Sequence, residues 1–149
     1  RDQPVPRGPA EACRGVVIVL DEHLLGRQID RDVKKWYRGK VCFITDLRPG
    51  TVIKDEVIPA LLRRHRGSLF VTINERDFWR RSPADPRYCI ACLVLSDARA
   101  SAVPELLRRL LRHPQLRTAA LRSGKVLRVT RNEVSFYTHL EAAVQRTPL

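Results

Sequence analysis

Residues 16–24 read Val-Val-Ile-Val-Leu-Asp-Glu-His-Leu, and they decide how the rest of the chain is interpreted. The first five residues are apolar and mostly β-branched, which is typical of a strand buried on both faces in a parallel sheet. Two acids, Asp21 and Glu22, follow at once. Because ligands of parallel α/β sheets bind beyond the carboxyl ends of the strands, these acids are candidates for a functional site.

Strand and helix patterns alternate along the chain that follows. Further strands are expected at residues 41–44, 69–72 and 90–95. Helical spacing of apolar residues predicts helices from Leu25 to Trp36, at 55–66 with Asp55 as N-cap, at 103–112 and at 114–122. Strands at 126–129 and 134–137 are expected to form a C-terminal β-hairpin that turns at Asn132. This order predicts an α/β fold with a mostly parallel central sheet flanked by helices.

The domain organisation follows from composition. Residues 1–14 are rich in proline, glycine and charge, so we interpret them as a flexible extension, and residues 15–149 as a single domain of common size. The apolar runs are too short to span a bilayer and no signal peptide is recognisable, so we expect a cytoplasmic protein that does not contact a membrane. Cys89 and Cys92 have C-x-x-C spacing within an expected strand, which predicts buried thiols on opposite faces rather than a zinc site.

The net charge of the chain points to a polyanionic partner. The sequence has 28 Lys and Arg against 16 Asp and Glu, a formal net charge of +12, and most of the positive residues are arginines. Arginine binds phosphate in a bidentate manner, and a strongly positive protein attracts nucleic acid. The simpler alternative is a solvated basic surface with no dedicated partner.

The acidic residues are the minority, and many of them follow predicted strands or begin a helix at the same edge of the sheet. Clustered carboxylates repel one another unless cations compensate them, and Mg²⁺ or Mn²⁺ prefers such oxygen ligands. The alternative is that Asp55 caps its helix, that Asp46 and Asp97 are turn residues, and that arginines neutralise the others. Eight of the sixteen acids belong to this set: Asp21, Glu22, Asp46, Asp55, Glu56, Glu75, Asp77 and Asp97.

Several segments match a known family in their order and spacing. Residues 17–24 end in Asp-Glu-His-Leu, residues 41–47 and 55–58 read Val-Cys-Phe-Ile-Thr-Asp-Leu and Asp-Glu-Val-Ile, and residues 69–78 end in Thr-Ile-Asn-Glu-Arg-Asp-Phe. With the closing strands, they resemble the PIN-like ribonuclease family, in particular its small bacterial branch, which often occurs in toxin–antitoxin gene pairs. The resemblance runs from about Val16 to His139 and implies a three-layer PIN-like fold.

The resemblance also implies a site. Asp21, Asp55 and Asp77 would be the catalytic, metal-binding carboxylates, assisted by Glu22, Glu56 and Glu75, and Asp97 could complete the set. His23 stands where the family has asparagine, and Glu75 where it has aspartate. Candidates for contacts with substrate are Thr72, Asn74, Arg27, Arg76, Arg80 and Arg81, with Trp79 available for base stacking. The alternative for the last group is a solvated loop in which Trp79 simply packs.

We therefore expect an endoribonuclease that depends on Mg²⁺ or Mn²⁺. RNA is the expected substrate, and an antitoxin protein and a second copy of the chain are candidate partners. A non-catalytic nucleic-acid-binding or regulatory module on the same fold is the main alternative. A phosphoacceptor signalling domain fits poorly, because residues 72–74 are Thr-Ile-Asn where that chemistry needs an aspartate. No glycine-rich phosphate loop is present, so nucleotide hydrolysis is not expected.

Overall fold

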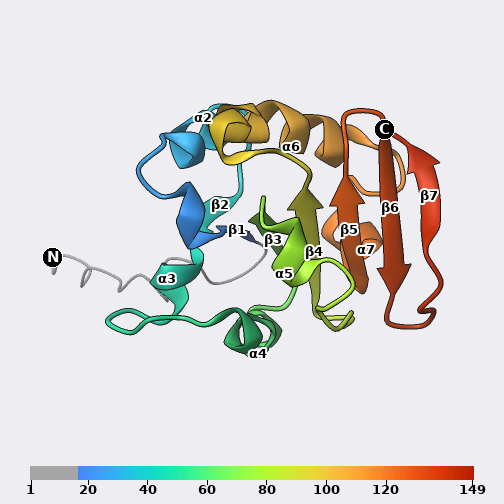
Figure 1. The fold of residues 1–149 in the computed structure, drawn as a ribbon, viewed down its shortest axis with the longest axis horizontal. Helices are drawn as coiled ribbons and strands as arrows, with labels where there is room; N and C mark the ends of the chain where they lie inside the picture. Colours follow the sequence, from blue (N-terminus) through green and yellow to red (C-terminus); the bar gives the residue numbers. More distant parts are fainter. Residues whose placement is uncertain (1–16) are drawn as a thin grey trace, which may run out of the picture.

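A seven-stranded sheet forms the centre of the protein in the computed structural model, which describes residues 17–149 (Figure 1). The strand order is β2-β1-β3-β4-β5-β6-β7, in which β1 to β5 run parallel and β6 and β7 are antiparallel to their neighbours. The expected extension at residues 1–14 lies outside the described residues. The strands are β1 (Val17–Leu20), β2 (Lys40–Phe43), β3 (Ser68–Thr72), β4 (Tyr88–Leu93), β5 (Lys125–Val129), β6 (Glu133–Thr138) and β7 (Gln145–Pro148).

Helices pack on both faces of this sheet, so the α/β class and the mostly parallel sheet are confirmed. In β1, Ile18 and Leu20 belong to one buried apolar cluster, and Val17 and Val19 belong to the other. This explains the uninterrupted apolar run of β1. Helices α2 and α6 lie side by side over the first cluster, as Figure 1 shows. The helices are η1 (Glu22–Leu24), α2 (Ile29–Lys34), α3 (Ile44–Leu47), η2 (Asp55–Val57), α4 (Ile58–Arg63), α5 (Glu75–Phe78), η3 (Asp97–Ala102), α6 (Val103–Arg112) and α7 (Ala119–Arg122), of which the three labelled η are 3₁₀ helices.

Helix boundaries differ from the sequence expectation where the backbone takes left-handed conformations. The first long helix does not begin at Leu25, because Gly26 and Gln28 have φ of 74° and 60° and α2 starts only at Ile29. Leu25 is exposed as a result. Asp55 is not the N-cap of a regular helix: it begins a 3₁₀ turn, and α4 follows with Pro59 in its first turn. Helix α6 spans the expected residues.

Short elements were missed. Helix α3 follows β2 directly, and Asp46 stabilises its start by accepting a hydrogen bond from the backbone N–H of Phe43 at 2.9 Å. The segment after β3 contains α5, for which no helix was predicted, and β7 adds a further edge strand. Helix α7 starts only after Thr118, whose hydroxyl caps it by accepting from the N–H of Leu121.

The cysteine expectation is confirmed for the part of the chain that the structure describes. Cys89 and Cys92 lie in β4, in opposite apolar clusters, and both are buried free thiols. Burial raises the pKa of the Cys89 thiol to about 12, so it stays protonated and unreactive at neutral pH.

As for membranes, none of the helices within residues 17–149 has both the length and the apolar character that crossing a bilayer requires.

Candidate acidic site at the carboxyl edge of the sheet

Asp21 is a nearly fully buried carboxylate at the end of β1, with only 2% of its surface exposed. The parallel register of β1 and β3 pairs Leu20 with Val71, so the next residues, Asp21 and Thr72, are adjacent. The Thr72 hydroxyl donates a hydrogen bond of 2.6 Å to Oδ2 of Asp21. Burial raises the pKa of Asp21, and the Thr72 hydrogen bond offsets part of that increase. Thr72 therefore holds this carboxylate in place.

Asn74 orients a second carboxylate, that of Asp77 in α5. The Nδ2 of Asn74 donates to Oδ2 of Asp77 at 2.7 Å, and Oδ1 of Asn74 accepts from the backbone N–H of Asp77 at 3.3 Å. The backbone N–H of Asn74 in turn donates to the Thr72 hydroxyl at 2.9 Å. A continuous chain of hydrogen bonds thus connects Asp21 to Asp77. Thr72 and Asn74 were predicted to contact substrate or water, and the structure shows that both contact the acids.

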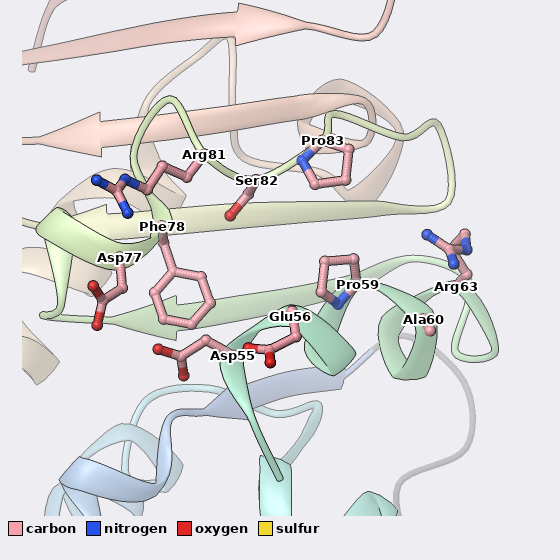
Figure 2. Close-up of a pocket in the computed structure, with 10 residues that line it drawn as sticks. All are labelled: Asp55, Glu56, Pro59, Ala60, Arg63, Asp77, Phe78, Arg81, Ser82 and Pro83. Carbon is pink, nitrogen blue, oxygen red and sulfur yellow. The ribbon is translucent and has the colours of Figure 1, made fainter.

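Asp55 joins these two carboxylates from the start of η2. Its pKa is raised by burial, by the negative charges of Asp21 and Asp77, and by a side-chain hydrogen bond with Asp77, and is partly lowered by His23. Figure 2 shows Asp55 and Asp77 together beside the ring of Phe78. The structure therefore brings Asp21, Asp55 and Asp77, from three separate segments, close enough to interact electrostatically. We call these three residues the acid cluster.

The other predicted acids differ in their surroundings. Glu75 accepts a hydrogen bond of 2.5 Å from Nε of Arg128, and Asp97, whose side chain is 79% exposed, pairs with Arg27 at 2.5 Å. Glu56 lines the cavity next to Asp55, and the charge of Glu22 contributes to the raised pKa of Asp21. Within residues 17–149, no member of the acid cluster forms an ion pair with a lysine or arginine.

The acid cluster has the ligand type that a hard divalent cation prefers, but its side chains are not arranged as a metal site. Its oxygen donors are the ligand type that Mg²⁺ and Mn²⁺ prefer, and no lysine or arginine of the described residues pairs with its carboxylates. Yet in the described part of the chain no group of three His, Cys, Asp or Glu side chains is arranged to hold a metal ion. The side chains would therefore have to move together to bind one.

Two arginines share a cavity of about 510 Å³ with Asp55 and Asp77 (Figure 2). Arg81 was predicted as a phosphate contact, whereas Arg63 was missed. The sequence did carry a signal for Arg63, because Glu56, Pro59 and Arg63 have the spacing of one helix face and all three line this cavity. We call the space between the two arginines and the two acids the acidic cleft.

The remaining predicted substrate contacts lie elsewhere. Arg80 donates to the carbonyl of Ala142 at 2.7 Å and covers the ring of Tyr137, with 5.0 Å from its guanidinium carbon to the ring centroid. Trp79 packs on the same tyrosine, with ring centroids 5.3 Å apart, which agrees with the packing alternative. Arg76 lines a separate shallow cavity with Asn74 and Trp79.

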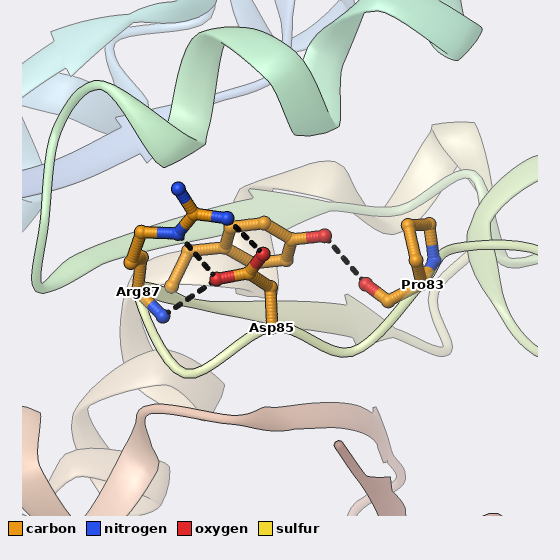
Figure 3. A network of polar contacts seen from close by, with 4 residues as sticks. Pro83, Asp85 and Arg87 are labelled. Carbon is orange, nitrogen blue, oxygen red and sulfur yellow. Dashed lines mark hydrogen bonds and ion pairs between the residues drawn. The ribbon is translucent and has the colours of Figure 1, made fainter.

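The loop that carries Arg81, Ser82 and Pro83 into the acidic cleft is held by an internal ion pair and by hydrogen bonds from two tyrosines. Asp85 accepts two side-chain hydrogen bonds from Arg87, at 2.9 and 2.8 Å, and the Tyr88 hydroxyl donates to the carbonyl of Pro83 at 2.5 Å (Figure 3). The hydrogen bonds from Arg87 lower the pKa of Asp85 to about 2. The Tyr137 hydroxyl donates to the carbonyl of Ser82 at 2.5 Å. The two tyrosines thus connect this wall of the cleft to β4 and β6.

Comparison of this chain with protein-family models, with curated proteins and with solved structures finds no match. The chemistry of the acid cluster and its cleft therefore carries the functional interpretation.

Proposed function

We propose that the protein is a divalent-metal-dependent endoribonuclease on a three-layer PIN-like fold, with Asp21, Asp55 and Asp77 as its metal ligands. One observation carries the proposal. In a chain of net charge +12, three neighbouring carboxylates form no ion pair with a lysine or arginine within residues 17–149, although twenty-eight of these residues occur in the sequence. Such repulsion is costly to stability, and a bound cation would relieve it.

In phosphodiester hydrolysis, the acids, the residues that orient them and the arginines of the cleft would have different roles. A divalent ion, when bound, supplies Lewis-acid stabilisation and lowers the pKa of a water molecule. Thr72 and Asn74 hold Asp21 and Asp77 through the hydrogen bonds described above. Arg63 and Arg81 line the same cavity as Asp55 and Asp77, and their guanidinium groups can bind the phosphates that flank the scissile bond.

RNA is the substrate we favour, and the toxin of a toxin–antitoxin pair is the biological role we propose. Both rest on the resemblance of the strand-end motifs and on the excess of arginine. An antitoxin would inhibit the enzyme by covering the acidic cleft. A cytoplasmic location is part of the same proposal, because that is where its RNA substrates are found.

A second candidate function is a nucleic-acid-binding or regulatory module that does not cleave. One observation favours it, namely that the described residues contain no complete metal-binding group. In that case the cleft would bind nucleic acid through Arg63 and Arg81 while the acids had only a structural effect.

An RNA cleavage assay separates the two functions. We would compare the parent protein with Asp77→Asn, in Mg²⁺, in Mn²⁺ and in chelator, on single-stranded and structured RNA. Asn74 can still donate to an asparagine oxygen, so the substitution removes charge and keeps the shape. The matched control is Asp32→Asn, because Asp32 lies on α2, paired with Lys35 at 3.1 Å and outside the acid cluster.

We expect metal-dependent cleavage by the parent and the control, and a loss of at least about 100-fold in Asp77→Asn, which is typical when a group that stabilises the transition state is removed. RNA binding by Asp77→Asn should be unchanged or stronger, since one negative charge is lost. Cleavage at the parental rate by Asp77→Asn, or no cleavage by the parent with either metal, would refute the proposal.

A further inference from the structure

A second cavity, of about 430 Å³, opens at the opposite edge of the sheet from the acid cluster. Trp36 and Tyr37 line it between the end of α2 and the start of β2, and Arg122 lines it just before β5 begins. These positions are at the amino ends of parallel strands, whereas the acid cluster follows their carboxyl ends. The volume is within the range of small-molecule sites, roughly 300–1,000 Å³. We call this cavity the arginine pocket.

The charge of the arginine pocket is entirely positive. Arg108, Arg112, Arg117 and Arg122 line it, and no acid does. Within residues 17–149 none of these four arginines forms an ion pair with a carboxylate. In the acidic cleft, by contrast, acids and arginines occur together. The arginine pocket therefore matches an anion.

Arg122 gives the strongest argument that the arginine pocket binds an anion. The residue is only 4% exposed, and among the described residues its guanidinium makes one hydrogen bond, from Nη1 to the carbonyl of Leu116 at 3.0 Å. Burial lowers the pKa of its guanidinium, which means that the folded protein disfavours this charge. A buried charge is costly unless it is paired. A guanidinium has five N–H donors, so most of its capacity is left for a ligand.

Aromatic rings add a second kind of recognition to the arginine pocket. Trp36 and Tyr37 pack edge to face, with ring centroids 6.2 Å apart and planes at 72°, and both are half-buried. Gly39 makes the position of Tyr37 feasible, because a Cβ at residue 39 would lie 2.5 Å from the tyrosine ring. Aromatic faces next to arginines are typical of sites where a base stacks and its phosphate is bound by guanidinium groups.

We propose that the arginine pocket binds a nucleotide, with its phosphate at Arg112, Arg117 and Arg122 and its base against Trp36. The nucleotide is either free or one unit of an RNA strand, since both present the same chemistry. The pocket lies away from the acidic cleft, so it is a second nucleotide site and does not depend on the protein being a nuclease.

Fluorescence titration tests this inference directly. Trp36 becomes the sole tryptophan in a Trp79→Phe background, because the chain has two tryptophans. The probes are adenosine monophosphate, adenosine, inorganic phosphate and a 2′-O-methyl RNA hexamer, which resists cleavage. All titrations are done in chelator, so the outcome does not depend on metal-dependent cleavage.

Two double variants separate pocket recognition from general charge. Arg112→Gln/Arg117→Gln removes two exposed arginines of the pocket, while Arg64→Gln/Arg66→Gln removes the same charge from exposed positions after α4. We expect adenosine monophosphate or the hexamer to change Trp36 fluorescence, and the first double variant to weaken that binding at least tenfold. The control should weaken it less than twofold.

The arms of the experiment also identify the source of the nucleotide. Binding of the monophosphate identifies a site for a free nucleotide, and binding of the hexamer alone identifies a site for an RNA strand. The inference is overturned if neither probe changes Trp36 fluorescence, if both double variants weaken binding equally, or if phosphate alone binds as tightly as the nucleotide. The two proposals can fail independently: the protein can cleave RNA without binding nucleotide in the arginine pocket, or bind nucleotide there without cleaving RNA.

Discussion

The hydroxyl of Thr72 donates a hydrogen bond of 2.6 Å to the buried carboxylate of Asp21, and this contact links β3 to the end of β1. Asp21 has no ion pair within residues 17–149, so Thr72 is its principal source of side-chain stabilisation. The same hydroxyl accepts the N–H of Asn74 and so connects Asp21 to the residue that orients Asp77. The geometry of the acid cluster therefore depends on a neutral side chain.

Replacing Thr72 by valine should destabilise the protein by about 1–3 kcal/mol, the cost of leaving a buried polar group unsatisfied. The pKa of Asp21 is already raised by burial, and it should rise further without its donor. A carboxyl with a raised pKa costs stability only while it is ionised, so the destabilisation should shrink as pH falls through that pKa. Urea unfolding at pH 7 and pH 4.5 measures the effect. Thr72→Ser, which keeps the donor, should behave like the parent at both pH values, and an equal loss in both variants would contradict this role.

Asp55→Asn should be more stable than the parent in chelator, and it should not gain the stability that divalent cations give the parent. In chelator it should raise the melting temperature, because the asparagine removes the repulsion that Asp21 and Asp77 exert on Asp55. Added Mg²⁺ or Mn²⁺ should raise the melting temperature of the parent but not that of the variant, since binding to the folded state stabilises it. Thermal unfolding at both conditions provides the measurement, with Asp32→Asn as the control. If metal shifts Asp55→Asn as much as the parent, Asp55 is not a ligand.

The parallel sheet could be predicted from sequence because a strand that is buried on both faces has an uninterrupted run of apolar residues. The residues of β1 alternate between two apolar clusters, so the whole strand is apolar. The start of α2 could not be predicted in the same way. Leu25 continues the helical spacing of Ile29 and Val33, yet the positive φ of Gly26 and Gln28 interrupts the backbone there. Periodicity reports which face is buried, and it does not report the backbone conformation of each residue.

In the candidate site, the positions of some acids could be predicted from the sequence, whereas their ion-pair partners could not. The sheet brings the carboxyl ends of its parallel strands together, so the proximity of Asp21, directly after β1, and Asp77, in α5 after β3, follows from topology. Side-chain partners do not follow from topology. Asp97 also follows a strand, but Arg27, seventy positions away in sequence, pairs with it. Which acids are neutralised depends on long arginine side chains from distant segments. The order of residues in the sequence does not show which acid each arginine contacts.

The pair of Asp85 and Arg87 should make stability depend on pH in the acid range. Arg87 lowers the pKa of Asp85 to about 2 from the ordinary value of 3.8. A depressed carboxyl pKa contributes stability that is present above about pH 4 and is lost as pH falls toward 2. Asp85→Asn should therefore be modestly less stable than the parent at pH 6, and the difference should disappear near pH 2. Chemical unfolding across this range tests it, and a difference that does not change with pH would show that the ion pair contributes nothing.

Gly39→Ala should change the arginine pocket without changing its charge. The added Cβ would lie 2.5 Å from the ring of Tyr37, and because that ring is the far end of a flexible side chain, it can move aside at little cost to folding. We therefore expect stability within about 1 kcal/mol of the parent, together with several-fold weaker nucleotide binding, since the edge-to-face packing of Tyr37 on Trp36 would be lost. Thermal unfolding and the Trp36 titration measure the two quantities on one sample. Gly50→Ala is the matched control, because a Cβ there meets no atom within 4 Å, although its φ of 80° predicts some strain in the loop. Unchanged nucleotide binding in Gly39→Ala would show that Tyr37 takes no part in shaping the pocket.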